Sequence, residues 1–541
     1  MEETITPTKG RVWNWKFYIF LILILALCYL PFPNRHPQYD GIKYYAQAKA
    51  LNWNDPGLLP ANDMLVSPVF NISALLAKNI GFGTSLSHWL SVTDSLVMIV
   101  ALVLLYAFYR RITGSDTGAL WSCLALGVCF STWYFATDIE NVALTVFASS
   151  LLLCIGWQRN KKESFLRGIL MGLLGTFAAL CHQSLIVLAI FTGIYLLRQR
   201  MIKQAVAYFS TLLLTLILVY LFASLIFYSI NTISGVVGYV FGYVGQTGVG
   251  GWHKLDWSTP MAGVIGFSRA FLGLHPLMNI AWFRTLAING LPGNILSNQI
   301  AIASGIPSLL QTPLIISTFV LLLSLPIFLT LAVKGVAPQP NDKSSGADKT
   351  LMLVYAIVTA ILALWWLPQG GEFWLSAIIF LIPLVASHLL KLKPVVWIYA
   401  FIWVGLLAFT NLFGSIRPFA DETVDPTLPS ILYLDEIRQP DDLYLIPYSE
   451  AYPQRWVFPW VIPVNAIVLE SNLRDERWER LFRKSRRIVY YSSELLQLKS
   501  GEETDMRDPA YIMTLKDWAD LTRNYEKIHS FGEMEILAAK R

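Results

Sequence analysis

Residues 85–111 read SLSHWLSVTDSLVMIVALVLLYAFYRR, and this stretch decides the fold class. Between Ser85 and Tyr109 the only Asp, Glu, Lys or Arg is Asp94, and a membrane-spanning helix needs about 20 mostly apolar residues. The pair Arg110-Arg111 follows directly, and basic residues beside a span favour its cytoplasmic end. The stretch therefore predicts a spanning helix that ends in the cytoplasm and carries one carboxylate inside it.

The whole chain has the composition of a membrane protein. Of its 541 residues, 55% are hydrophobic and only 14% are charged, and the mean hydropathy is +0.51. Because soluble domains have about 25% charged residues, a soluble enzyme and a disordered chain are both excluded. The aromatic content of 13%, with 19 Trp, suits many positions at the membrane interface. The net charge of +5 gives no indication of a nucleic-acid partner.

About eleven stretches are apolar enough to span a bilayer. The expected spans are 15–32, 85–109, 117–136, 139–157, 165–180, 184–197, 205–228, 313–333, 351–367, 373–390 and 395–412. Clusters of Lys and Arg precede the first span and follow spans two, four, six, eight and ten, so that every cluster falls on one side. That side is predicted to be cytoplasmic. The N-terminus is then inside, and we expect a bacterial inner membrane.

Three regions are predicted to lie outside the cell: the 33–84 loop, the 229–312 region and the C-terminal tail. The 229–312 region is rich in Gly, Tyr and Trp, and we expect re-entrant or interfacial helices there. A hidden pair of spans in this region is the alternative, and it would leave the tail on the same side.

The charge distribution divides the chain after residue 414. Residues 1–414 contain 14 acidic and 24 basic residues, whereas residues 415–541 contain 22 acidic and 17 basic residues. We therefore expect a membrane domain over 1–414 and a small soluble α/β domain over 415–541. In the tail, the pattern predicts strands at 442–447, 466–470, 487–491 and 534–538, and an exposed helix at 474–484.

Eight of the 14 carboxylates of the membrane domain lie away from the basic clusters, and most of these eight are expected outside the spans or at their outer ends. They are Asp40, Asp55, Asp63, Asp94, Asp138, Glu140, Asp256 and Glu372. A carboxylate inside a span, such as Asp94, costs about 2.5–3.5 kcal/mol on insertion scales and usually faces a cavity or a partner.

Asp40 opens a short amphipathic helix on the outer surface. Its carboxylate is a candidate for chemistry, and the alternative is a cap on the N–H groups of that helix. Asp138 and Glu140 lie where span three meets span four, and the same alternative applies to them. Two acids spaced i and i+2 cannot both cap, and Glu140 is expected one turn inside the next helix, which favours a functional role for it.

Five further candidates lie at outer junctions or in the outer 229–312 region. Glu372 follows a Gly pair between two spans, and His182 lies between spans five and six, where a structural hydrogen bond is the alternative role. Arg269 and Arg284, with His275 between them, could meet a phosphate. Anchoring at the membrane surface is the competing role for these cations.

Together these features resemble the GT-C superfamily of membrane glycosyltransferases. That group includes protein O-mannosyltransferases, aminoarabinose transferases and polyprenyl-phosphate-sugar-dependent mannosyltransferases. The resemblance covers about residues 10–415 and lies in the order of the motifs. These are one span, an outer loop opening with Asp40-Gly41, the acid pair between spans three and four, the turn His182-Gln183, and a late outer loop with Glu372. The chain departs in having no second acid beside Asp40 and no clear Asp–His metal constellation.

The resemblance implies a reaction at the outer face. A sugar would move from a polyprenyl-phosphate donor to the hydroxyl of a glycan, lipid or protein acceptor, with inversion, and Asp40 would be the general base. Substrate-binding roles are implied for Lys43, Asp138, Glu140, His182, Arg269, Arg284 and Glu372. No cofactor is firmly implied, no metal ligands are predicted, and the use of a divalent metal is left open.

Three other functions remain open from the residues. A transporter or lipid flippase would also have many spans and a few intramembrane acids, although transporters usually show internal repeats with broken helices, and we find none. A polymerase or ligase of lipid-linked glycans would usually have a large outer loop rich in Arg and His. A non-catalytic assembly protein could use the apolar stretch 448–463 of the tail as a binding patch.

Overall fold

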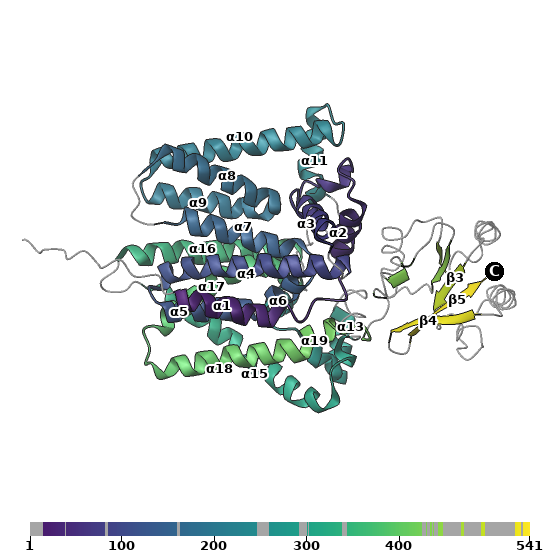
Figure 1. Ribbon diagram of the computed structural model, residues 1–541. Helices are drawn as coiled ribbons and strands as arrows, with labels where there is room; N and C mark the ends of the chain where they lie inside the picture. The colour runs from purple at the N-terminus through teal and green to yellow at the C-terminus, as the bar shows by residue number, and fades with distance from the viewer. Residues whose placement is uncertain are drawn as a thin grey trace, which may run out of the picture.

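The protein is a helical bundle with a small β-sheet beyond one end (Figure 1). The computed structural model describes residues 15–37, 39–81, 85–158, 163–245, 259–290, 302–337 and 343–424, the five strands of the tail and a few single residues near them. The helices of the bundle are α1 (Trp15–Tyr29), α4 (Leu86–Thr113), α5 (Asp116–Gly127), α6 (Phe130–Thr137), α7 (Asn141–Gly156), α8 (Phe165–Cys181), α9 (Ile186–Arg198), α10 (Ile202–Ile226), α15 (Ser308–Gly335), α16 (Lys343–Trp366), α17 (Gly371–Leu389) and α18 (Val395–Asn411).

The described helices account for every expected span. Six of them are long and apolar enough to cross a membrane, namely α4, α10, α15, α16, α17 and α18. The pair α5 and α6, bent by 65°, adds a seventh if it counts as one span. The other four expected spans are the shorter apolar helices α1, α7, α8 and α9. The protein is therefore a polytopic integral membrane protein, as expected.

Shorter helices lie outside the bundle proper. They are α2 (Tyr39–Ala50), η1 (Pro56–Leu58), α3 (Val66–Ile80), η2 (Gln183–Leu185), α11 (Ile233–Gly245), α12 (Thr259–Phe271), η3 (His275–Asn279), α13 (Ala281–Gly290), the π-helix η4 (Leu412–Ile416) and α19 (Arg417–Phe419). The 229–312 region thus forms short helices, and no described helix in it has the length of a span.

Helices α2, α3 and α13 lie at the end of the bundle nearer the sheet (Figure 1). Arg111, at the end of α4, donates from Nη2 to the carbonyl of Cys154 near the end of α7 at 2.8 Å. Lys391, just after α17, donates from Nζ to the carbonyl of Ala337 just after α15 at 2.9 Å. The end of α4 is therefore joined to the end of α7, and the end of α17 to the end of α15, each by a basic side chain.

The break between α5 and α6 frees backbone carbonyls inside the bundle, and side chains satisfy them. The Tyr29 hydroxyl donates to Gly127 O at 2.7 Å, and Asn411 Nδ2 donates to Val128 O at 2.7 Å. Asn411 Nδ2 also donates to Phe271 O at 2.8 Å. Non-helical backbone at membrane depth is tolerated only where such partners exist. The break turns α6 so that its end leads into the 138–140 turn.

The described part of the tail is a five-stranded sheet. Its strands are β1 (Leu443–Ile446), β2 (Ile467–Leu469), β3 (Ile488–Ser492), β4 (Tyr525–Phe531) and β5 (Met534–Lys540), in the order β2-β1-β3-β5-β4. β1 is parallel to β2 and β3, and β5 is antiparallel to β3 and β4. The four expected strands are all present. The sequence prediction missed β4, because YEKIHSF has no clear apolar run, and the expected 474–484 helix lies outside the described residues.

Candidate functional site

Helix α2 lies directly against the turn between α6 and α7, and Gly41 permits this contact. A Cβ atom at Gly41 would lie only 2.5 Å from the carbonyl oxygen of Ile139 and 3.1 Å from Pro37 Cβ. Asp40, in the first turn of α2, is therefore held next to the 138–140 turn. The order Asp40-Gly41 thus has a structural reason, since the glycine lets its neighbour approach a second segment of the chain.

Polar side chains of α4 hold the 138–140 turn and the end of α6 in place. Ser95 Oγ donates to Ala136 O at 2.7 Å, and the backbone N–H of Glu140 donates to Asp94 Oδ2 at 2.9 Å. The side chain of Asp94 is only 3% exposed. The carboxylate inside span two therefore faces a partner, and that partner is the backbone of the outer turn.

The two acids of the turn differ from expectation in one respect. Glu140 is the N-cap residue of α7 and accepts from Asn141 N with Oε2 at 3.0 Å, so the interpretation that it lies one turn inside the helix is wrong. Asp138 ends α6 and accepts from Ile139 N with Oδ1 at 2.8 Å. Burial, and then the charge of Asp40, raise the pKa of Glu140 well above its usual value.

Glu372 and Arg269 join the same end of the bundle from α17 and α12. Arg269 Nη1 donates to Gln369 O at 3.2 Å, in the loop just before Glu372. Gly371 allows α17 to begin against α6 and α12, because a Cβ there would lie 2.5 Å from Ser131 Oγ. Glu372 is close enough to Arg269 and to Asp40 to interact electrostatically with both.

Asp40 is open to solvent and yet surrounded by protein on several sides. Burial raises the pKa of its carboxyl group, the charge of Lys43 lowers it, and the charge of Asp63 raises it again. Lys43 lies one turn along α2, with its Nζ 5.7 Å from the centre of the Tyr44 ring. An exposed carboxylate with another acid close to it is an arrangement suited to proton transfer.

His182 has the structural role that was weighed against a functional one. Its Nδ1 accepts from Ser184 N at 3.2 Å and lies 2.7 Å from Ser184 Oγ. The next residue, Gln183, donates its backbone N–H to Asn62 O at 2.8 Å, which ties this turn to the loop before α3. Burial lowers the pKa of His182, so its imidazole is neutral at neutral pH.

The hydrogen bonds of Arg284 and His275 go to residues other than the acids. Arg284 is exposed on α13, and its Nε donates to Met278 O at 2.8 Å. Among the described residues, no recorded interaction joins Arg284 to Asp40, Glu140 or Glu372. His275 is buried with its Nδ1 2.7 Å from Ser415 Oγ, and burial followed by the charge of Arg269 lowers its pKa to about 3.

Asp63 belongs to this site and was not predicted to. It lies in the loop between η1 and α3, its side chain is 2% exposed, and its Oδ2 accepts a short hydrogen bond from the Tyr44 hydroxyl. Asp63 thereby supplies the second acid that the sequence around Asp40 lacks. The only signal in the sequence was a lone acid within the apolar run LLPANDMLV over residues 58–66.

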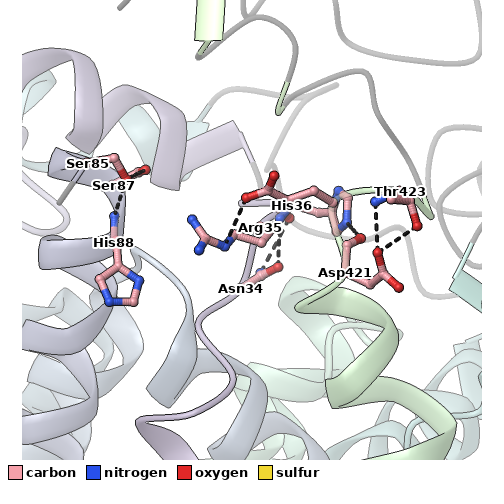
Figure 2. Close-up of polar contacts among 9 residues, drawn as sticks. Asn34, Arg35, His36, Ser85, Ser87, His88, Asp421 and Thr423 are labelled. Carbon is pink, nitrogen blue, oxygen red and sulfur yellow. Dashed lines mark hydrogen bonds and ion pairs between the residues drawn. The ribbon is translucent and has the colours of Figure 1, made fainter. Parts of the chain in front are cut away.

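The segment that enters α2 is held by the segment that follows α18 (Figure 2). Arg35 donates its backbone N–H to Phe419 O at 2.9 Å, and its Nε lies 3.4 Å from Glu422 Oε1. His36 Nε2 lies 2.9 Å from Asp421 O. Residues 419–422 therefore hold the segment that leads into α2, and the 138–140 turn lies against the start of α2 itself.

In the part of the chain that the structure describes, no group of three or more His, Cys, Asp or Glu side chains has a geometry that could hold a metal ion. Asp94, Asp138 and Glu140 accept hydrogen bonds from backbone N–H groups, and Asp63 accepts one from Tyr44.

Comparison with known proteins relates part of the chain to a family of enzymes. Residues 75–224 match the sequence profile of the dolichyl-phosphate-mannose-protein mannosyltransferase family. This stretch is less than half of the chain, and it contains α4, the 138–140 turn and His182. It confirms the resemblance to the GT-C superfamily, and the class is that of a membrane glycosyltransferase, an enzyme. No curated protein matches the sequence.

Several solved structures are similar in architecture. The Archaeoglobus fulgidus oligosaccharyltransferase, in a complex with Zn and sulfate, is 12% identical, with 88% of this chain and 68% of that chain covered and a TM-score of 0.46. ArnT from Cupriavidus metallidurans bound to undecaprenyl phosphate is 10% identical, with 98% of both chains covered and a TM-score of 0.43. Its apo form is also 10% identical, with 97% of both chains covered and a TM-score of 0.45. Because these scores are low, no residue role and no ligand is carried over from them.

Proposed function

We propose that this glycosyltransferase moves a sugar from a polyprenyl-phosphate donor to an acceptor hydroxyl at the outer face of the membrane. The observation that supports this most is convergence: Asp40, Glu140, Glu372 and Arg269 come from four separate segments and meet at one end of the bundle. An accessible carboxylate, two further acids and a cation are the groups that transfer of a sugar from a phosphate requires.

Asp40 is the general base in this proposal. The acceptor oxygen attacks the anomeric carbon, the bond from that carbon to the phosphate oxygen breaks, and the hydroxyl proton passes to Asp40. The pKa of Asp40 is raised by burial, which makes its carboxylate a stronger base than an ordinary aspartate. A single displacement of this kind inverts the configuration at the anomeric carbon.

The leaving polyprenyl phosphate gains negative charge as the bond breaks, and cations stabilise it. Lys43 and Arg269 are assigned this role, because both are electrostatically linked to the acids of the site. Arg284 is expected to contribute less, since it is exposed on α13 and its Nε already donates to Met278 O.

The remaining acids orient the sugar. Glu140 has a raised pKa and therefore favours the protonated form, which can donate a hydrogen bond to a sugar oxygen as well as accept one. Glu372, in the first turn of α17, interacts electrostatically with Glu140. Asp138 and His182 act through the backbone turns that they stabilise, at 138–140 and 182–185.

The site is proposed to face away from the cytoplasm. Arg110 and Arg111 lie in the last turn of α4, whereas Asp94 in the first half of α4 contacts the 138–140 turn beside α2, and basic residues favour the cytoplasmic side. The N-terminus is then cytoplasmic, the 415–541 domain lies outside, and the membrane is the inner membrane of a bacterium. The acceptor would be a glycan, a lipid or a protein that reaches this face.

The alternative of a transporter or flippase rested on the many spans and on intramembrane acids such as Asp94. Because Asp94 accepts a hydrogen bond from Glu140 N, its presence is explained by the outer turn. No transport path is needed to account for it.

The proposal is tested with purified protein in proteoliposomes and a panel of radiolabelled polyprenyl-phosphate sugars. We expect label to appear in an acceptor with stoichiometric release of polyprenyl phosphate. Asp40→Asn is expected to abolish transfer, and Asp55→Asn, the same change in the same outer loop, is expected to retain it. Movement of label across the bilayer without release of polyprenyl phosphate would instead identify a flippase.

A further inference from the structure

Two side chains one turn apart on α2, Tyr44 and Gln47, fasten this helix to the residues that follow it by three hydrogen bonds. Tyr44 donates its hydroxyl to Asp63 Oδ2. Gln47 donates from Nε2 to Gly57 O at 2.8 Å, and its Oε1 accepts from Ser67 Oγ at 2.6 Å. The face of α2 that carries Tyr44 and Gln47 is thus held along its length by residues 57–67.

That loop is in turn held in place by tyrosines from α10, α11 and the segment between them. The hydroxyls of Tyr228 and Tyr239 both donate to Leu59 O, at 3.2 and 2.6 Å. The hydroxyl of Tyr220 donates to Ala61 O at 3.0 Å. Asp63 is therefore presented to α2 from a loop whose backbone is anchored on two sides, by the bundle and by α2 itself.

Asp63 carries an unusual feature for a purely structural residue. Its side chain is 2% exposed, and within the described part of the chain its Oδ1 has no hydrogen-bond partner. A buried carboxylate with an unsatisfied oxygen is costly, and an Asn side chain would accept the Tyr44 hydrogen bond without that charge. The charge itself therefore requires an explanation.

The structure assigns Asp63 as a positioning residue for the base: it fixes α2 through Tyr44 and places a negative charge beside Asp40. Tyr44 lies four residues after Asp40, so both side chains project from the same face of α2. This inference rests on the proposed function of Asp40. It adds to that function by assigning a role to an acid from another segment of the outer loop.

The groups around Asp40 show why this charge matters. Lys43 on α2, Asp63 from the loop, Glu140 from the 138–140 turn and Glu372 from α17 all interact with Asp40 electrostatically. The groups that face Asp63 are Tyr44, His182, Tyr228, Tyr239 and Asp40. Burial lowers the pKa of His182, which favours the neutral form of the imidazole beside Asp63. Asp63 therefore keeps Asp40 a stronger base.

Two variants separate the two parts of this role. Asp63→Asn keeps an acceptor for the Tyr44 hydroxyl and removes the charge. Tyr44→Phe keeps the charge and the ring, which packs against Phe70 with centroids 5.5 Å apart, and removes the hydrogen bond. Asp55→Asn is the matched control, because Asp55 lies in the same loop and caps Gly57 N at 2.8 Å.

The measurement is the pH profile of kcat/KM for sugar transfer, with the unfolding temperature as the check on folding. For Asp63→Asn we expect the acidic limb to move to lower pH, because loss of a nearby negative charge makes Asp40 easier to deprotonate. For Tyr44→Phe we expect an unmoved limb and a kcat lower by about tenfold, because α2 is less well positioned. Asp55→Asn is expected to match the wild type.

An Asp63→Asn profile with the wild-type limb would overturn the inference, and so would a wild-type kcat in Tyr44→Phe. The pH profile distinguishes positioning from mere support, because a purely structural residue lowers activity at every pH without moving the limb. Failure of the inference is also distinguishable from failure of the proposed function. If Asp40→Asn still transfers sugar, the proposed function fails; if it is inactive while Asp63→Asn behaves as wild type, only the inference fails.

Discussion

Replacing Gly41 with alanine separates the position of Asp40 from its chemistry. The added methyl group would lie 2.5 Å from Ile139 O, whereas carbon and oxygen atoms in close contact normally lie about 3.3–3.6 Å apart. The start of α2 must therefore move away from the 138–140 turn by about 0.8 Å or more, because the obstacle is a backbone carbonyl that Asp94 and α4 hold in place. Asp40 retains its carboxylate in this variant and loses only its place.

The expected effect is large on the rate and small on the fold. A displacement of about 1 Å of a reacting group can cost about 10²-fold in rate, and overpacking of this size costs about 1–3 kcal/mol in stability. We therefore expect Gly41→Ala to lower kcat by about 10²-fold while the protein remains folded in detergent. The assay is sugar transfer from the preferred polyprenyl-phosphate donor, measured beside the thermal unfolding temperature.

Gly238→Ala is the matched control. It is the same substitution at another outer helix, and a Cβ at Gly238 would meet nothing within 4 Å. We expect wild-type activity from it. Wild-type kcat in Gly41→Ala would refute the argument that contact with the 138–140 turn positions the base, and equal losses in both variants would show that the effect is not specific to the site.

Four further outcomes follow from the same contacts. Asp94→Leu leaves a buried N–H of the outer turn without its acceptor and should lower stability by about 1–3 kcal/mol by thermal unfolding, whereas Asp94→Asn should not; equal stabilities would contradict this. Asn411→Leu leaves two buried carbonyls unsatisfied at about 1–3 kcal/mol each, and an unchanged unfolding temperature would count against its role at the helix break. Arg269→Met should lower kcat by about 10²-fold and Arg269→Lys by less, and equal kcat values for Arg269→Met and wild type would remove it from the phosphate site. Since Asp40 must be deprotonated to accept a proton and its pKa is raised, the kcat/KM profile should rise with pH through a midpoint above 3.8, and a midpoint at or below that value would contradict the environment described.

The spans could be predicted from the sequence because they depend on local composition. Each of the eleven expected stretches is a helix or a bent pair, since about 20 apolar residues leave a chain in lipid few alternatives. The bend of 65° between α5 and α6 could not be predicted, because it depends on Tyr29 and Asn411, which come from distant helices and satisfy the freed carbonyls.

The site was predictable only in part, for the same physical reason. Asp40, Glu140 and Glu372 stood out because acids are rare in this part of the chain. Asp63 did not stand out, because its importance arises from a hydrogen bond to Tyr44 across a folded loop. Arg284 was a candidate by charge and region, and the structure places it on α13 with its Nε bonded to Met278 O.

The sequence predicted that Asp94 would have a partner or face a cavity, but it did not predict which partner. The cost of a carboxylate inside a span predicts a partner or a cavity, and the structure shows a partner, the N–H of Glu140. The sequence could not indicate that this partner belongs to the outer turn beside Asp40, because that contact exists only after α4 and α6 have packed together.

The most direct test of the account is single-turnover sugar transfer by Asp40→Asn in proteoliposomes, with Asp55→Asn alongside and donor binding measured on the same samples. The account predicts that Asp40→Asn binds the polyprenyl-phosphate sugar with wild-type affinity and transfers none of it, while Asp55→Asn transfers at the wild-type rate. Transfer by folded Asp40→Asn at the wild-type rate would contradict the claim that this carboxylate is the base.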